Sequence, residues 1–593
     1  MIEPRIYRAA LVPALLAVLV AMFAVESRPA PLPRGLTADE LFDPSRALAD
    51  AEDIAEASAR PERRGAGPPG SESARFVAES FAASGFETRI DRFEAGGRRL
   101  ANVIGRRAGT ASTESQIVVV AGRDGVGPGG PVAGAADTAA LLELGRALEG
   151  RPSRRTVTLV SLEGARIDEA GARRLAQDLP PVRVEAVLAL SGLGARATLE
   201  SPIIEWSNDS SRTSARLTRT AGDAVRQEIG SLPGQESVPA QLVRLGFPLG
   251  LGAQGVMLER GLHAIRFSGS GELPAPERSL DALDEERYAA LATAVLRTIS
   301  ALDERGLPRA EPPSTYLAGE RQVVPGWSVL LVAFALLVPA LVTVADGFAR
   351  AGRRRGRVGA WTLWALAGAL PFAVAYALLR LLDLVALVPG FAVAIPPAAE
   401  PPTTWAIVLL VSLAVVSALG WFLGRRPLVR RLHGLSRPSA PAAGAAVALT
   451  VCLAALAVWA LDPLAALFLV PAVHLWSGAA IIERPRLGLV LVMAGLVLPL
   501  AVAVFYLERL SLGPLDGLWY LCLLVAGGHV SPPAALLGCV LVGAFCSLVA
   551  VLAARAGEQA GAPPPRPPEP PLRGPLTHAG PGSLGGTRSA LRR

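Results

Sequence analysis

The sequence predicts two fold classes in one chain: an α/β class domain built as a three-layer α/β/α sandwich, then an all-α multi-span transmembrane bundle. Residues 26–325 have the composition of a soluble protein and alternate predicted strands with helices. Residues 327–553 are long Leu, Val and Ala runs broken by Pro, Gly and Arg. With 593 residues, 51% of them hydrophobic, and a mean hydropathy of +0.40, the chain is expected to lie in a membrane.

The domain boundaries follow from these changes in composition. Arg5 and Arg8 precede an apolar run, and no clean small-x-small cleavage site follows it, so an uncleaved membrane anchor is predicted at the N-terminus. The predicted segments are the anchor at 1–25, a linker at 26–70, the α/β domain at 71–305, a linker at 306–326, the bundle at 327–553 and a disordered tail at 554–593.

Arginine clusters predict the orientation of the chain. They follow alternate apolar spans, at 350–357, 425–437 and 484–486, and each loop is cytoplasmic if the anchor runs from inside to outside. The segment from Leu515 to Ala526 is short for a span, so eight spans are predicted rather than nine. The expected localisation is multi-pass in the cell membrane, with the N-terminus cytoplasmic and residues 26–325 extracytoplasmic.

Charge and residue types exclude several classes of function. The net charge is +7, but Arg is the only strong cation and much of it lies in short loops between apolar runs, which is a membrane pattern, so no nucleic-acid partner is expected. The chain has no Lys, which removes Schiff-base chemistry. All cysteines fall in apolar segments, so the α/β domain has no disulfide and no thiol nucleophile or ligand: Cys452, Cys522, Cys539 and Cys546.

The stretch from Ile117 to Arg166 carries the most informative pattern. It consists of a predicted strand and Asp124, a Gly-rich loop, a helix that contains Asp137, and a strand that leads to Glu163. This order and spacing resemble the family-28 zinc metallopeptidases, which are aminopeptidases with an α/β/α sandwich. In that family the run carries His-x-Asp, a second Asp that opens the helix, and a Glu-Glu pair after the next strand.

The resemblance, which covers roughly Ser71 to Arg305, implies a metal site that has lost most of its ligands. Asp124 and Asp137 match two metal-binding positions and are the candidate metal ligands, as vestiges of the site. The remaining positions have changed: Gly122 replaces the His, Ala165 and Arg166 replace the Glu pair, Ser191 replaces the next Asp, and His263 stands where the family has a Pro.

Glu163 is the candidate catalytic residue, because it ends the strand that carries the acid pair; Asp168 and Glu169 are alternatives. An inward Arg166 would oppose a dication, since a unit charge pair about 4 Å apart at a dielectric of about 20 is worth about 4 kcal/mol. A carboxylate-only site suits Mg²⁺ or Ca²⁺ better than zinc. Gly125 to Gly130 form G-x-G-x-x-G, but Pro128 opposes the turn of a dinucleotide site. No cofactor is expected, or zinc if the site is active.

Three functions are open. The first is a catalytically degenerate pseudopeptidase in the membrane that binds a peptide, a lipid-linked substrate or a partner protein, in a layout similar to the GPI-transamidase aminopeptidase-like subunit. The second is an active, divergent membrane-bound metallo-aminopeptidase built on Asp124, Asp137 and Glu163. The third is a transporter or lipid-handling protein, suggested by His474 inside a predicted span and by Pro residues within spans. Membrane lipid is an expected partner in each case.

Overall fold

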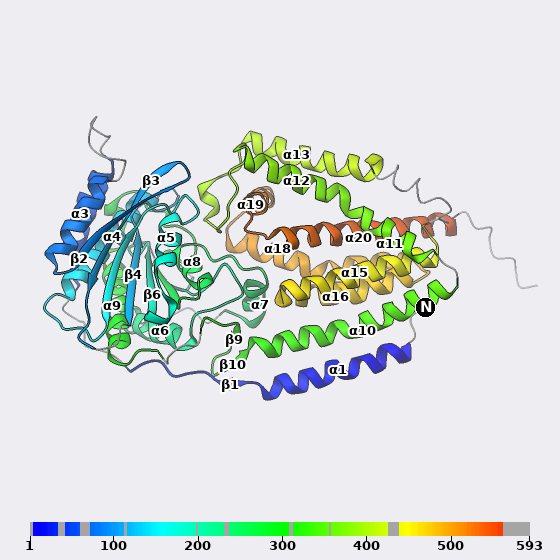
Figure 1. The fold of residues 1–593 in the computed structure, drawn as a ribbon, viewed down its shortest axis with the longest axis horizontal. Coiled ribbons are helices and arrows are strands. Elements are labelled where there is room, and N and C mark those ends of the chain that lie inside the picture. Colours follow the sequence, from blue (N-terminus) through cyan, green and yellow to red (C-terminus); the bar gives the residue numbers. More distant parts are fainter. Residues whose placement is uncertain are drawn as a thin grey trace, which may run out of the picture.

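The computed structural model describes residues 4–33, 42–59, 71–111, 115–127, 129–196, 198, 200–230, 236–307, 312–354, 357–424 and 438–560. A β-sheet with helices on both faces forms one end of the molecule, and long apolar helices form the other (Figure 1). Residues 42–307 are called the sheet domain, and α1 (Pro4–Phe23) with residues 326–560 the helical bundle. The predicted fold class is confirmed for both regions. The tail predicted as disordered at 554–593 begins within a helix that continues to Ala560, and the rest of it, from 561 onward, lies outside the described residues.

The sheet has seven strands in the order β2-β3-β5-β4-β6-β8-β7. Their bounds are β2 (Glu87–Ala95), β3 (Arg98–Arg107), β4 (Gln116–Gly122), β5 (Thr156–Leu162), β6 (Val184–Ser191), β7 (Ile203–Ile204) and β8 (Ala264–Ser268). Strands β5, β4, β6 and β8 run parallel, whereas β2, β3 and β7 are antiparallel to their neighbours. The carboxyl ends of the parallel strands therefore meet at one edge, which is where open α/β sheets bind their ligands.

The central strand β4 shows why the domain has three layers. Ile117 and Val119 enter one apolar core, and Val118 and Val120 enter a second core on the opposite face, because successive side chains of a strand alternate. The first core is covered by α2 (Pro44–Ala59), α3 (Ser71–Ala83), α4 (Gly130–Ala147), α6 (Ala215–Ile229) and α9 (Glu285–Arg305). The second is covered by α5 (Ala170–Asp178) and α8 (Ala253–Glu259). Burial on both faces explains the continuous apolar strands.

Both segments predicted as linkers contain ordered elements. Helix α2 places Ala47, Ala51 and Ile54 in the first core, at the i, i+4, i+7 spacing of one helix face. A small sheet joins β1 (Glu26–Ser27), β10 (Gln322–Pro325) and β9 (Tyr316–Ala318) in the order β1-β10-β9. It lies where the chain leaves α1 and where it enters α10 (Gly326–Arg353). The two ends of the sheet domain are thus held together beside the bundle.

The helical bundle agrees with the predicted number of spans. Its helices after α10 are α11 (Val358–Leu366), α12 (Leu370–Leu384), α13 (Thr404–Leu419), α15 (Pro441–Leu461), α16 (Pro463–Ile481), α17 (Pro485–Gly495), α18 (Val497–Arg509), α19 (Pro514–Gly527) and α20 (Pro532–Ala560). Within the described residues of the chain, eight helical segments are long and apolar enough to cross a membrane, and α19 is too short. These segments support a multi-pass membrane protein.

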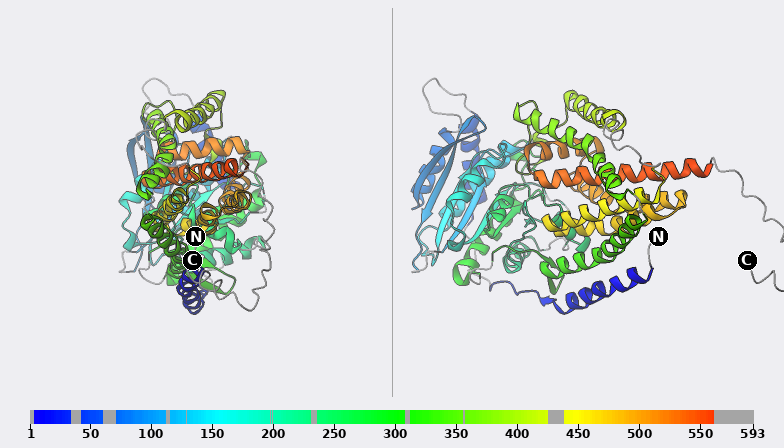
Figure 2. Two further views of the ribbon diagram at one scale, coloured as in Figure 1. Left: turned by 90° about the vertical axis from the view of Figure 1, so that its right-hand side faces the viewer. Right: turned by 45° about the vertical axis from the view of Figure 1, so that its right-hand side comes forward.

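The sheet domain lies beside the bundle, as the right-hand view of Figure 2 shows, and the two share an apolar cluster. Val126, from the loop after β4, lies in one apolar cluster with Phe391, Ile395 and bundle residues of α19. The Tyr520 hydroxyl group donates a hydrogen bond to the carbonyl oxygen of Ile395 at 2.7 Å, which fixes the loop between α12 and α13 on α19. The carboxyl edge of the sheet therefore faces the helical bundle.

Candidate functional site

A cavity of about 90 Å³ lies at the carboxyl edge of the parallel strands. Its walls include the strand ends Gly122 and Leu162, and Pro396 from the loop between α12 and α13. Its charged lining residues are Asp124, Asp137, Glu163, Glu169, Arg266 and Glu272. The three candidates from the sequence thus reach one cavity, because the strands that precede them end at the same edge.

Asp124 holds the loop that follows β5. Its carboxylate accepts hydrogen bonds from the backbone N–H groups of Gly164, at 2.8 Å, and Ala165, at 3.2 Å. Gly164 has a φ of +101°, which the absence of a side chain allows. Both carboxylate oxygens are therefore engaged by the protein itself.

Asp137 holds the loop that follows β6 in the same way. It lies in the second turn of α4 with 4% of its surface exposed, and it accepts hydrogen bonds from the N–H groups of Gly192, at 2.6 Å, and Leu193, at 3.0 Å. Burial raises the pKa of Asp137 to about 6, although both N–H groups stabilise the charged form. Both oxygens of this carboxylate are therefore also engaged by backbone groups.

Glu163 forms a partly buried ion pair. Its carboxylate accepts a hydrogen bond from the Arg123 guanidinium group at 2.9 Å and another from the backbone N–H of Ala101 at 2.8 Å. Burial raises the pKa of Glu163 even though the Arg123 charge opposes that change. Arg123, which lies between Gly122 and Asp124, therefore directs the candidate catalytic carboxylate toward β3.

Glu169 differs from the other carboxylates of the cavity. It is 8% exposed, and its side chain has no hydrogen-bond partner among the described residues. Asp168 and Glu169 have φ values of 49° and 51°, a left-handed conformation that is uncommon for residues with side chains. Backbone strain of this kind concentrates at functional sites. Burial, reinforced by the charge of Asp124, raises the pKa of Glu169 to about 8.

Replacing Glu169 with Gln is expected to stabilise the protein at alkaline pH. The carboxyl group keeps its proton in the folded state up to about pH 8, whereas an unfolded Glu loses it near pH 4.3, so stability falls as the pH rises between these values. Glutamine cannot ionise, and the variant should gain on the order of 1 to 4 kcal/mol at pH 8.5 but little near pH 4. The thermal unfolding midpoint at both pH values measures this effect.

The control for this experiment is Glu79→Gln, because the Glu79 side chain on α3 is 72% exposed. It should unfold like the unchanged protein at both pH values. An equal midpoint for Glu169→Gln and the unchanged protein at pH 8.5 would contradict the assignment of Glu169 as a protonated, buried acid.

Two charged residues of the cavity lining, Arg266 and Glu272, were missed in the sequence analysis. Arg266 lies in the middle of β8, is 6% exposed, and lines the cavity. Its guanidinium group donates hydrogen bonds to the carbonyl oxygens of Gly271, at 3.4 Å, and Glu272, at 3.0 Å. Burial lowers the pKa of Arg266, whereas nearby carboxylates, Glu272 first among them, raise it. The signal that could have found Arg266 is an arginine between Ile265 and Phe267, at the centre of a short predicted strand.

Arg166, which was expected to supply the opposing charge, does not line the cavity. It is exposed on the turn between β5 and α5, just after Gly164. The positive charge among the carboxylates comes instead from Arg266, on a strand that is distant in sequence. His263 is also outside the cavity lining, and its Nδ1 atom lies 3.2 Å from the backbone N–H of Ser214.

The residues present do not fit a pair of zinc ions. A catalytic zinc ion takes about three protein ligands from His, Cys or carboxylate side chains. In the described ranges of the chain, no group of three or more such side chains is placed to hold a metal ion. Asp124 and Asp137 use their oxygens for backbone N–H groups, Glu163 is paired with Arg123, and a guanidinium group lies among them.

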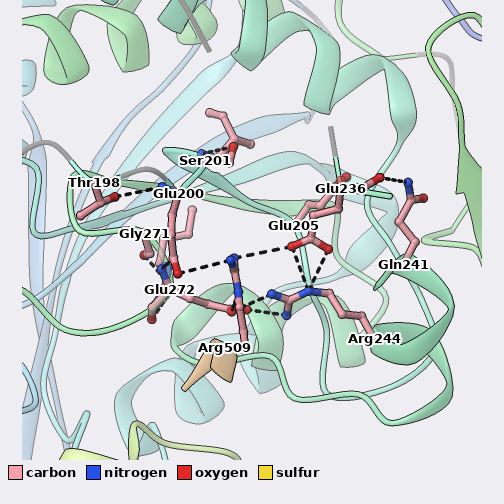
Figure 3. Close-up of polar contacts among 12 residues, drawn as sticks. Thr198, Glu200, Ser201, Glu205, Glu236, Gln241, Arg244, Gly271, Glu272 and Arg509 are labelled. Carbon is pink, nitrogen blue, oxygen red and sulfur yellow. Dashed lines mark hydrogen bonds and ion pairs between the residues drawn. The ribbon is translucent and has the colours of Figure 1, made fainter. Parts of the chain in front are cut away.

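Glu272 connects the cavity to the helical bundle. Arg244 of α7 (Val238–Gly246) donates to both Glu272 oxygens, at 2.7 and 2.8 Å, and Arg509, the last residue of α18, donates to one of them at 2.8 Å. Arg509 also pairs with Glu200 at 3.3 Å and Glu236 at 3.5 Å, so the cluster joins separate segments of the sheet domain to one bundle helix (Figure 3). The two cations lower the pKa of Glu272 to about 2.

Solved structures with partial similarity to this chain are zinc aminopeptidases and glutaminyl cyclases. A zinc aminopeptidase from Bacillus subtilis is 13% identical with a TM-score of 0.34, over 45% of this chain and 96% of that one. A glutaminyl cyclase from an Acidobacteriales bacterium is 17% identical with a TM-score of 0.33, over 47% and 99%. An aminopeptidase from Aneurinibacillus sp. strain AM-1 is 12% identical with a TM-score of 0.36, over 46% and 98%. No protein-family model matches the sequence, and no curated protein is similar to it in sequence.

Proposed function

We propose that this chain is a multi-pass membrane protein whose extracytoplasmic domain, of the family-28 zinc-peptidase type, binds a ligand in its cavity and has lost zinc-dependent cleavage. The ligand is a peptide, a lipid-linked molecule or a segment of a partner protein. The proposed layout of anchor, outer peptidase-like domain and multi-span bundle is that of the GPI-transamidase aminopeptidase-like subunit, without GPI chemistry being implied.

The position of Arg266 carries this proposal. A permanent cation, buried in the cavity, neutralises some of the negative charge that a zinc pair would otherwise balance. At an effective dielectric of about 20, a unit charge about 4 Å from a like charge costs about 4 kcal/mol, and the cost doubles for a dication. The oxygens of Asp124 and Asp137 already have donors, so a metal ion would also have to compete with backbone hydrogen bonds.

Metal content and peptidase turnover test the proposal on the purified full-length protein in a maltoside detergent. We expect far less than one zinc ion per chain after dialysis against zinc-containing buffer, and no release of p-nitroaniline from aminoacyl p-nitroanilides. The Asp137→Asn variant should give the same result as the unchanged protein. Stoichiometric zinc, together with turnover that Asp137→Asn abolishes, would instead establish the divergent metallo-aminopeptidase.

A further inference from the structure

Arg266 is the exception among the buried arginines of the sheet domain. Three others each pair with a carboxylate: Arg123 with Glu163, Arg212 with Glu205, and Arg244 with Glu272. Arg266 is buried to a similar degree, but it forms no ion pair with any residue that the structure describes. Buried cations are normally paired, because an unpaired charge in a low dielectric is strongly unfavourable.

The guanidinium group also has unused hydrogen-bond donors. Its two hydrogen bonds, to the carbonyl oxygens of Gly271 and Glu272, both come from the Nη2 atom. The Nε atom is buried and has no partner among the described residues. An arginine side chain presents its N–H groups as a planar fork that matches the oxygens of a carboxylate or phosphate group. The cavity that Arg266 lines is about 90 Å³, well above the roughly 10–15 Å³ that admits a water molecule.

The other carboxylates of the cavity lining have partners of their own. Asp137 accepts two backbone N–H groups, and Glu272 is held by Arg244 and Arg509. Asp124 also accepts two backbone N–H groups, and Glu163 is paired with Arg123. Glu169 is the last acidic group of the cavity lining, and its pKa of about 8 means that it keeps its proton at neutral pH. It can therefore act as a hydrogen-bond donor beside Arg266. The cavity thus contains a guanidinium group and a neutral carboxylic acid. Among the described residues, no carboxylate forms an ion pair with Arg266.

We propose that the cavity binds the oxyanion group of a ligand, a carboxylate or a phosphodiester with a single negative charge, with Arg266 as its principal contact and Glu169 as its second donor. A single charge suits the site because Asp124 and Asp137 share the cavity and would repel a dianion. The inference rests on the proposed function, since it gives the chemical class of the ligand for the same cavity.

The source of such a group is either a lipid headgroup or a soluble molecule. Pro396, in the loop between α12 and α13, forms one side of the cavity wall, and Val126 at the cavity packs with apolar residues of the bundle. The cavity therefore lies at the junction between the sheet domain and the bundle. Phosphatidylglycerol represents the first source in the experiment, and hexanoate and dimethyl phosphate represent the second.

The test measures thermal unfolding of the full-length protein in maltoside micelles at pH 7. Hexanoate and dimethyl phosphate should raise the unfolding midpoint, whereas their uncharged counterparts hexanamide and trimethyl phosphate should not. In Arg266→Gln the affinity for the anions should fall by about 10- to 100-fold, because the variant loses a charge-assisted hydrogen bond. Arg166→Gln is the matched control, because it removes the same charge from an exposed position and should bind like the unchanged protein.

If Arg266→Gln does not fold, Arg266→Lys replaces it in the test, because lysine keeps the positive charge but lacks the planar arrangement of N–H groups. The affinity of Arg266→Lys for the anions should be about tenfold lower than that of the unchanged protein. A rise with phosphatidylglycerol alone assigns the site to a lipid headgroup, and a rise with the soluble probes assigns it to a soluble oxyanion. The inference is overturned if no anion raises the midpoint, or if the folded Arg266 variants bind like the unchanged protein. If the protein contains no zinc, has no peptidase activity and does not bind the anions, this inference is overturned and the proposed function is retained.

Discussion

Replacing Glu272 with Gln should lower the free energy of unfolding by about 3 to 5 kcal/mol, the usual result of removing one partner from a buried ion pair. The Glu272 side chain is 1% exposed and forms ion pairs with both Arg244 and Arg509. A neutral amide would leave two guanidinium groups to share the remaining carboxylates, Glu200 and Glu236. Arg509 belongs to the bundle, so the loss should loosen the sheet domain from the bundle as well as the cavity wall.

This effect should depend on pH in a defined direction. The pKa of Glu272 is about 2 in the folded protein and about 4.3 when unfolded, so its contribution to stability is complete above about pH 4.3 and is lost as the pH falls toward 2. The variant should therefore lose some of the acid-dependent fall of the unfolding midpoint. Glu286→Gln, at an exposed position on α9, is the control and should change stability by less than about 0.5 kcal/mol. Equal midpoints for Glu272→Gln and the control would contradict the ion cluster.

Replacing Gly130 with Ala should cost about 3 kcal/mol, at the upper end of the range for overpacking. An added Cβ atom at Gly130 would lie 2.2 Å from the carbonyl oxygen of Gly125 and 2.5 Å from its carbonyl carbon. Both contacts are with backbone atoms, so no side-chain rotation relieves them, and the loop between β4 and α4 must move. Because this loop lines the cavity, the variant should also bind anionic probes more weakly.

Gly122→Ala is the matched control for Gly130→Ala. It makes the same chemical change at another glycine of the cavity lining, but an added Cβ atom there has no neighbour within 4 Å. Its unfolding midpoint should equal that of the unchanged protein, and the two variants are compared by thermal unfolding in the same detergent. Equal losses in both would show that the close backbone approach of Gly125 and Gly130 is not what constrains the loop.

The part of the site that could be predicted from the sequence is the part that depends on the order of neighbouring strands, loops and helices in the chain. Parallel strands buried on both faces read as continuous apolar runs, so the alternation of strands and helices could be predicted. Asp124, Asp137 and Glu163 could be assigned to one site through the resemblance of their order and spacing to the family-28 zinc metallopeptidases. What each carboxylate does there could not be predicted. The partners of Asp124 and Asp137 are backbone N–H groups of the loops after β5 and β6, whose conformation no residue pattern specifies.

The rest of the site depends on contacts between distant segments. Arg266 enters the cavity because β8 lies beside β6, an order of strands that the sequence does not encode locally. Arg509 and Glu272 are 237 residues apart in the chain. Arg509 belongs to a bundle helix that is predicted from hydropathy alone, so its contact with Glu272 could not be predicted. The position of Arg166 after its strand suggests that it enters the cavity, but the turn at Gly164 leaves it exposed.

The pairing of β1 with β10 has a mechanical consequence. The residue pairs Glu26 with Val323 and Ser27 with Gln322 bind the exit of α1 to the entrance of α10, and Arg509 provides a further attachment on another side of the sheet domain. Because the attachments are at separate points, rotation of the sheet domain about a single hinge is restricted. These contacts favour one position of the cavity relative to the bundle, so the proposed ligand would have to reach it at the junction of the two regions.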